Sequence, residues 1–166
     1  FARLLARQLA EMWECTGRPR DFYVVEGAAG IGRLAGQFLN FAARELPEFY
    51  RASRYVAVEI SEARRATHAA ALSAHADAGR FQSAAEIPSE IPCGCILSNE
   101  LLDAMPVHRV VCKGGELREV YVAAEGEKLC EQLGPLSTAE IELFFREQGV
   151  ELREGHEGRA GRAHRP

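Results

Sequence analysis

The sequence lacks the features that would assign it to a membrane or to nucleic acid. None of its apolar runs approaches the roughly 20 residues that span a bilayer, so we expect no membrane-spanning segment. Basic residues are not in excess: 24 acidic side chains outnumber 20 Lys and Arg, and the net charge of −4 argues against a nucleic-acid partner. No basic-then-apolar leader follows Phe1, so we expect a start that is processed or cut, and a cytoplasmic location, or a mitochondrial one in a eukaryotic source.

Cysteine is present, but not in a pattern that would hold a fold together. The five residues are odd in number and irregularly spaced: Cys15, Cys93, Cys95, Cys112 and Cys130. The one close pair forms C-x-C rather than the C-x2-C of a zinc knuckle, and His68 and His75 have no evident third ligand. We therefore expect reduced thiols, no disulfide framework and no metal site.

The first hundred residues alternate apolar strands with amphipathic helices. Helices are predicted where apolar residues recur at helical spacing, and strands where short β-branched or aromatic runs occur. In chain order these are a helix over 1–16, a strand over 21–26, a helix over 33–46, a strand over 55–60, a helix over 62–78, a short strand near Phe81 and a strand over 94–99. This order predicts an α/β fold, with a Rossmann-like, mainly parallel sheet and helices on both faces.

The later residues predict a β-hairpin, a helix and a tail. Strands over 108–113 and 117–122 flank a Gly-Gly turn. The stretch from Ser137 to Glu140 matches a capping box and predicts a helix that ends near Gln148. The segment 153–166 lacks hydrophobic periodicity and is expected to be disordered, which leaves one domain over residues 1–152.

Acidic and small residues, of the types that bind cofactors, lie at the ends of the first two predicted strands. Glu26 ends the first strand and is followed by the small-residue turn GAAGIG, over 27–32. Glu59 ends the second strand, where a carboxylate can accept hydrogen bonds from ribose hydroxyls, and Ser61 caps the helix behind it. Because ligands bind at the carboxyl ends of strands in open parallel sheets, these residues are expected to line a site.

Two classes of cofactor fit this pattern. The sequence GIGRLA, over 30–35, matches the G-x-G-x-x-A fingerprint of nicotinamide cofactors, with Glu59 at the distance of the ribose-binding acid. In that fingerprint, however, the strand runs straight into the first glycine, whereas here a carboxylate and three small residues intervene. This arrangement is typical of S-adenosylmethionine sites, where an acid such as Glu26 suits an ammonium group and a sulfonium. We predict S-adenosylmethionine, bound by Glu26, Gly27, Ala28, Gly30, Gly32, Glu59 and Ser61.

A second polar cluster, SNELLDAMPVHR, follows the strand predicted over 94–99. Glu100 and Asp103 are three residues apart and would share one face of a helical turn, which Asn99 can cap. His108 can relay a proton near neutral pH. The same stretch also fits a capped turn with solvated acids.

Three stretches resemble the MidA-type methyltransferases, S-adenosylmethionine-dependent enzymes that include the mitochondrial complex I assembly factor and its bacterial relatives. The stretches are VVEGAAGIGRLAGQFL, YVAVEISEARRATHAAAL and SNELLDAMPVHRVV, the last with the family's N-E-x-x-D-A-x-P-V-H core. The resemblance departs at Ala28, where the family usually has a glycine, and this change is expected to crowd or shift the cofactor loop. Family members are considerably longer, so the sheet is expected to be incomplete at its C-terminal end.

The resemblance implies methyl transfer to a protein arginine, with a subunit of a respiratory complex as the candidate protein substrate. Carboxylates that bind a guanidinium fix its plane and help its proton leave. On this basis Glu100 would be the main substrate carboxylate, with Asp103, His108 and Asn99 assisting. Missing strands would instead favour a non-catalytic assembly or binding module, and a nicotinamide-dependent oxidoreductase is a further alternative.

Overall fold

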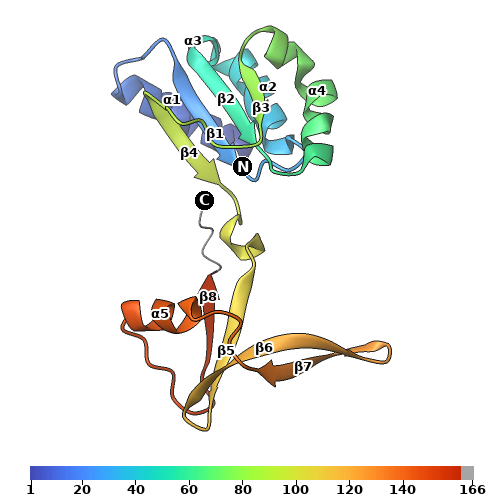
Figure 1. Cartoon of the computed structure of the whole chain (residues 1–166). Coiled ribbons are helices and arrows are strands. Elements are labelled where there is room, and N and C mark those ends of the chain that lie inside the picture. Colours follow the sequence, from blue (N-terminus) through green and yellow to red (C-terminus); the bar gives the residue numbers. More distant parts are fainter. Residues whose placement is uncertain (162–166) are drawn as a thin grey trace. The chain divides into compact units, whose positions relative to one another are not determined.

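The computed structural model describes residues 1–161, which form two compact units. The first unit runs from Phe1 to Leu101 and the second begins at Leu102, a division that the hydrophobic pattern does not predict. Each unit has a sheet of its own (Figure 1).

The first unit is built on a four-stranded parallel sheet with the order β3-β2-β1-β4. Its strands are β1 (Phe22–Gly27), β2 (Ser53–Val58), β3 (Phe81–Ala84) and β4 (Gly94–Ser98). Its helices are α1 (Ala2–Cys15), α2 (Arg33–Glu45), α3 (Pro47–Ala52) and α4 (Glu62–Asp77). The predicted parallel α/β fold is confirmed.

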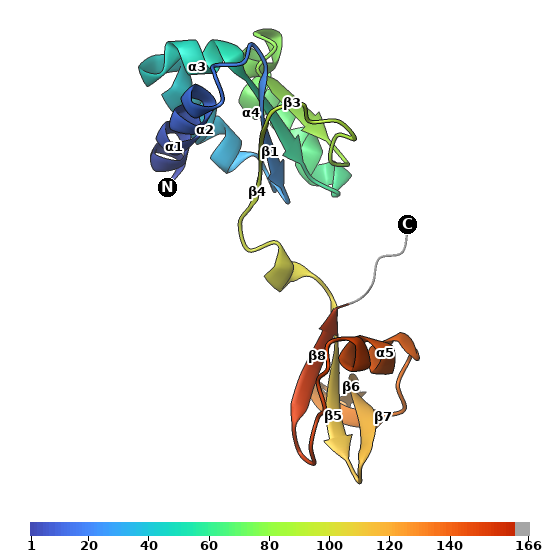
Figure 2. The ribbon, with the colours of Figure 1, turned by 90° about the vertical axis from the view of Figure 1, so that its left-hand side faces the viewer.

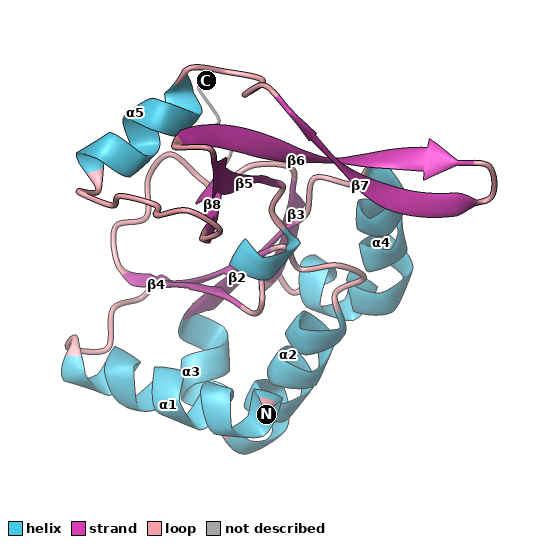
Figure 3. Cartoon of the chain, turned by 90° about the horizontal axis from the view of Figure 1, so that it is seen from below, coloured by secondary structure: helices cyan, strands magenta, loops and turns pink. Residues whose placement is uncertain are grey.

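All four helices of residues 1–101 pack on the same face of this sheet (Figure 3). On that face Val24 and Tyr55 are buried in one apolar cluster with side chains from each helix. The chain moves from β1 to β2 to β3 in one direction, and right-handed crossovers in one direction place their helices on one face. The opposite face presents Val25, Val56 and Val58. The expectation of helices on both faces is thus met on one face only, because the connection from β3 back to β4 contains no helix.

The second unit is a four-stranded antiparallel sheet with the order β7-β6-β5-β8. Its strands are β5 (Val107–Lys113), β6 (Glu116–Glu125), β7 (Lys128–Gly134) and β8 (Glu157–Gly161), with a 3₁₀ turn η1 (Leu102–Ala104) before β5. Helix α5 (Glu140–Glu147) buries Ile141 and Phe145 against Val110 and Ala160, and Figure 2 shows it beside β8. The predicted hairpin is confirmed as β5 and β6.

Two expectations about the second unit are wrong. Helix α5 begins at Glu140 with Ala139 as its N-cap, and the Oγ1 of Thr138, rather than the side chain of Ser137, accepts the N–H of Glu140 at 3.3 Å. The expected capping residue, Ser137, instead donates its N–H to the Glu119 carboxylate at 2.7 Å, so a tertiary contact replaces the capping box.

The other wrong expectation concerns the tail. Residues 157–161 form β8, which pairs with β5 and buries Ala160, whereas disorder was expected from 153 onward. The glycines in this segment hid the strand, because they remove the alternation by which a strand is predicted. Residues 162–166 of the expected tail lie outside the described residues.

Candidate cofactor site

Strand register brings the predicted cofactor residues to one edge of the first unit. Gly27, the last residue of β1, pairs with Val58 at the end of β2 and with Ser98 at the end of β4. The chain goes from β1 to β2 on one side and returns to β4 on the other, so β1 and β4 border a switch point, where open parallel sheets bind ligands. The glycine turn, Glu59 and Asn99 therefore begin at neighbouring points of the same edge.

The turn after β1 is built from residues in the left-handed region of backbone conformation. Ala28, Gly30 and Gly32 have φ values of 57°, 59° and 78°. Gly32 is the N-cap of α2, and a Cβ placed on it would come within 3.1 Å of His68 and Leu72 side-chain atoms. A Cβ on Gly30 would meet nothing within 4 Å, so open space lies beside this residue.

Ala28, the departure from the resembled family, does not break the turn. It adopts the left-handed conformation that a glycine takes without cost, and its side chain is exposed. The neighbouring Ala29 anchors the turn by donating its N–H to the Val58 carbonyl at 2.9 Å. The alanine is therefore accommodated with backbone strain at one exposed residue.

Glu59 ties the turn to the second strand. Its Oε2 accepts the N–H of Gly30 at 2.9 Å and its Oε1 accepts the N–H of Ser61 at 2.9 Å. Burial would raise the pKa of Glu59, but these N–H donors and the nearby charge of Arg64 lower it below its ordinary value. Glu59 is thus ionised at neutral pH, and each of its oxygens has a second lone pair for a ligand hydroxyl.

Ser61 lies beside this carboxylate as the N-cap of α4. Its Oγ accepts the N–H of Arg64 at 3.4 Å, as the sequence predicts for a capping serine. Its contribution to the site in this structure is the main-chain N–H that holds Glu59.

His68 is a part of this site that the sequence analysis missed. It is fully buried in α4, and its Nε2 lies 2.9 Å from the carbonyl oxygen of Gly30. Because a carbonyl only accepts, Nε2 carries the proton, and Nδ1 then accepts the Ser83 hydroxyl at 2.8 Å. The peptide groups of Gly30 are thus bound by Glu59 at the N–H and by His68 at the C=O.

The sequence contains only a weak signal for His68. Its spacing from Leu72 and His75 places the three on one helix face, which is buried in the structure. That spacing does not indicate which residue His68 bonds, because Gly30 lies 38 residues earlier in the chain.

Glu26 is the second carboxylate at this edge. It is 5% exposed, on the helix-covered face, and its Oε2 accepts the hydroxyl of Tyr55 at 2.7 Å. Burial raises the pKa of Glu26, and the hydrogen bond from Tyr55 offsets only part of this effect. A buried carboxylate with a raised pKa is stabilised in its charged form by a cationic ligand.

Asn99 and Glu100 follow β4 and are both exposed. Glu100 has a φ of 52°, so it precedes the helical turn and does not share a face of that turn with Asp103, as expected from their spacing. Within residues 1–161 its carboxylate has no hydrogen-bond or ion-pair partner. A strained, unpartnered carboxylate is of the kind found at functional sites.

Asp103 and His108 belong to the second unit. Asp103 is exposed in η1, and His108 lies in β5 with its Nδ1 2.7 Å from Glu119. Burial would raise the pKa of Glu119, but His108, Ser137 and Tyr121 lower it to about 2. Glu119 was not singled out by the sequence; in this unit it fixes the orientation of the His108 ring.

Comparison with known proteins identifies the family. A family model described as "Putative S-adenosyl-L-methionine-dependent methyltransferase" matches residues 4–160, and the chain belongs to that family. No curated protein matches the chain.

Two solved structures from Burkholderia thailandensis are similar to the chain. One is an uncharacterized protein with 28% identity and a TM-score of 0.68, and the match covers 96% of this chain and 41% of that one. The other was crystallised bound to S-adenosyl-homocysteine, with 28% identity, a TM-score of 0.67, and coverage of 96% and 40%. The chain therefore spans about two fifths of the length of these relatives.

Two classes of feature are absent from the described part of the chain. No helix among residues 1–161 has both the length and the apolar character needed to cross a membrane. In the same residues, no three side chains of His, Cys, Asp or Glu are grouped as metal ligands.

Ala28→Gly is expected to stabilise the first unit by about 0.5–1 kcal/mol. Glycine removes the strain of the left-handed conformation, and the greater conformational entropy of glycine in the unfolded chain offsets only part of this gain. Urea denaturation measures the difference. Ala29→Gly is the control, since Ala29 is buried and has no positive φ; it should destabilise. A lower stability of Ala28→Gly would contradict the assigned strain.

His68→Phe is expected to weaken binding of S-adenosyl-homocysteine about tenfold, because the turn would no longer be held in its binding conformation. Isothermal titration calorimetry measures the affinity. His75→Phe is the matched control: His75 is also buried in α4, but it bonds Tyr50 and Asn40 rather than the turn. Both variants should lose stability, and equal losses of affinity would argue against a specific role for His68.

Proposed function

We propose that this chain is the cofactor-binding part of an S-adenosylmethionine-dependent methyltransferase that methylates a protein arginine. The observation that carries the proposal is the turn after β1, whose Gly30 peptide is held between Glu59 and His68 at the switch point of the sheet. Family membership and the S-adenosyl-homocysteine bound to a similar structure support the choice of cofactor.

The residues at the edge fit this cofactor. Open space beside Gly30 leaves the turn accessible to a ligand, and Glu59 is ionised and able to accept ribose hydroxyls. Glu26 offers a buried negative charge for a cationic group. When bound, S-adenosylmethionine supplies a methyl group on a positively charged sulfur.

The arginine substrate rests on Glu100 and on the resemblance of its surroundings to the MidA-type family. Glu100 is exposed and has no partner among residues 1–161, so its carboxylate is available to bind a guanidinium in the bidentate geometry that such pairs favour. Bound in this way, a guanidinium nitrogen is oriented for in-line attack on the methyl group, and Glu100 accepts the proton that this nitrogen loses. A subunit of a respiratory complex is the proposed source of the arginine.

Titration of the purified chain with S-adenosylmethionine and, separately, with NAD tests the cofactor assignment. We expect binding of S-adenosylmethionine alone; binding of NAD alone would overturn the proposal.

The affinity for the cofactor should depend on pH through Glu26. Because the pKa of Glu26 is raised, this carboxylate becomes protonated as the pH falls, and the affinity for the cationic cofactor should decrease by at most about tenfold per pH unit. Glu59 stays ionised over the same range, so Glu26→Gln should remove the pH dependence.

Glu100→Gln is expected to abolish methylation of arginine peptides, because a neutral amide neither pairs with a guanidinium nor accepts its proton. The measurement is methyl transfer by the full-length protein, with cofactor affinity as the second readout. Affinity should be unchanged, and Glu86→Gln, an exposed acid between β3 and β4, should leave both unchanged. Retained turnover in Glu100→Gln would refute its role, whereas cofactor binding without turnover in the unaltered protein would favour a non-catalytic module.

A further inference from the structure

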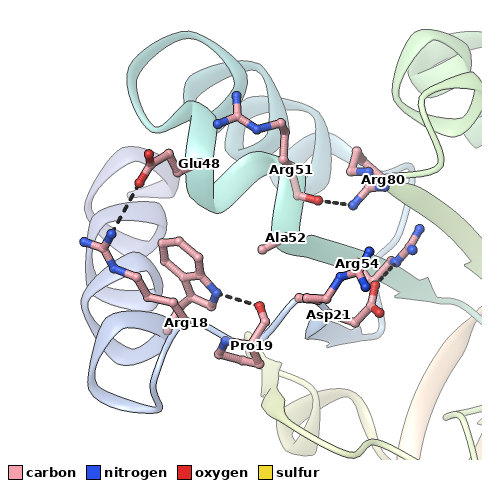
Figure 4. Close-up of a pocket in the computed structure, with 10 residues that line it drawn as sticks. Arg18, Pro19, Asp21, Glu48, Arg51, Ala52, Arg54 and Arg80 are labelled. Atoms are coloured by element: carbon pink, nitrogen blue, oxygen red, sulfur yellow. Dashed lines mark hydrogen bonds and ion pairs between the residues drawn. The ribbon is translucent and has the colours of Figure 1, made fainter.

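A pocket lies at the amino-terminal ends of the strands of the first unit, at the opposite edge of the sheet from the glycine turn. Residues 18–21 enter β1, residues 51–54 lead into β2, and Arg80 precedes β3. The pocket has a volume of about 390 Å³, which lies within the range of small-ligand sites. Trp13, Pro19 and Ala52 supply apolar parts of its wall (Figure 4).

Five arginines line this pocket: Arg18, Arg20, Arg51, Arg54 and Arg80. Two are neutralised, because Arg18 pairs with Glu14 and Glu48, and Arg54 pairs with Asp21 at 2.7 Å. Among the described residues, the other three have no carboxylate within ion-pair distance. The lining thus has three uncompensated positive charges, in a chain whose net charge is −4.

Main-chain carbonyl groups hold part of this positive charge in place. Arg80 donates to the carbonyl oxygen of Arg51 (Figure 4) and to that of Ala78. Arg54 donates to the carbonyl oxygen of Gly79. These carbonyls orient the guanidinium groups without cancelling their charge. Of the three arginines without a carboxylate partner, Arg80 is the one held in this way, and a guanidinium held in place loses little further order when it binds a phosphate or carboxylate oxygen.

We propose that this pocket binds a phosphate monoester, through Arg20, Arg51 and Arg80. A dianion matches the uncompensated charge better than a single carboxylate does, and its tetrahedral oxygens can accept from guanidinium groups that come from different elements. The wall of Trp13, Pro19 and Ala52 takes the organic group that bears the phosphate. The ester could belong to a small molecule or to a phosphorylated side chain, since both present the same dianion.

The test is calorimetric titration of the chain with phenyl phosphate, with benzoate, and with a short phosphoserine peptide. We expect saturable binding of the phosphate monoesters, weakening as NaCl is raised, and weaker binding of benzoate, which has the ring but one charge. Tighter binding of the peptide would identify a phosphoprotein as the source, and tighter binding of phenyl phosphate a small molecule. Absence of saturable binding of both would overturn the proposal.

The double variant Arg20→Gln with Arg51→Gln assigns the binding to this pocket. Neither side chain has a hydrogen bond to a described residue, so thermal stability should be retained, while affinity for phosphate monoesters should fall at least about tenfold. Arg3→Gln, an exposed change on α1 outside the pocket, is the control and should bind as the unaltered chain does. Equal affinity in the double variant would refute the site, and retained S-adenosyl-homocysteine binding would show that the cofactor edge is intact.

Discussion

The hydrogen bonds made by the main-chain N–H and C=O of Gly30 are the constraint on which the proposed cofactor site depends. The N–H donates to Glu59 and the C=O accepts from His68, so a left-handed residue in an open turn is held from both sides. The bonds tie the turn to β2 and α4, and through Ser83 to β3. A turn fixed in this way presents its open side to a ligand without first paying the entropy of ordering.

The apolar core supports that arrangement. Tyr55 is fully buried, and its ring centroid lies 5.2 Å from that of Phe38 in α2. Its hydroxyl donates a hydrogen bond to the Glu26 carboxylate. Packing of α2 against the sheet therefore positions Glu26 at the edge, and packing of α4 positions His68 under the turn. Because Gly32 has no side chain, α4 can approach the start of α2 closely enough for this contact.

Much of the secondary structure in both units could be predicted from the sequence, and the reasons are local. Strands such as β2 are apolar runs, the Gly-Gly turn between β5 and β6 requires two residues of positive φ, and Ser61 is a capping residue in a capping position. Once these strands pair in parallel, their register places the ends of β1, β2 and β4 side by side. What the sequence could not supply are contacts across long separations, such as His68 with Gly30, and local signals overridden by tertiary contacts, such as Ser137 with Glu119.

The backbone strain at Ala28 and Glu100 could likewise not be predicted from the sequence. Both positions are left-handed, which is unusual for residues with a Cβ, and neither was predicted from residue type alone. These two left-handed positions lie in the turn after β1 and in the stretch after β4, which together form the proposed site.

Hydrogen exchange of the Gly30 amide in the cofactor-free chain, followed by NMR, tests the central claim most directly. If the Gly30 peptide is held by Glu59 and His68 before any ligand binds, its N–H should exchange far more slowly than that of the exposed neighbour Ile31. Exchange of Gly30 at the rate of an unprotected loop amide would contradict the account.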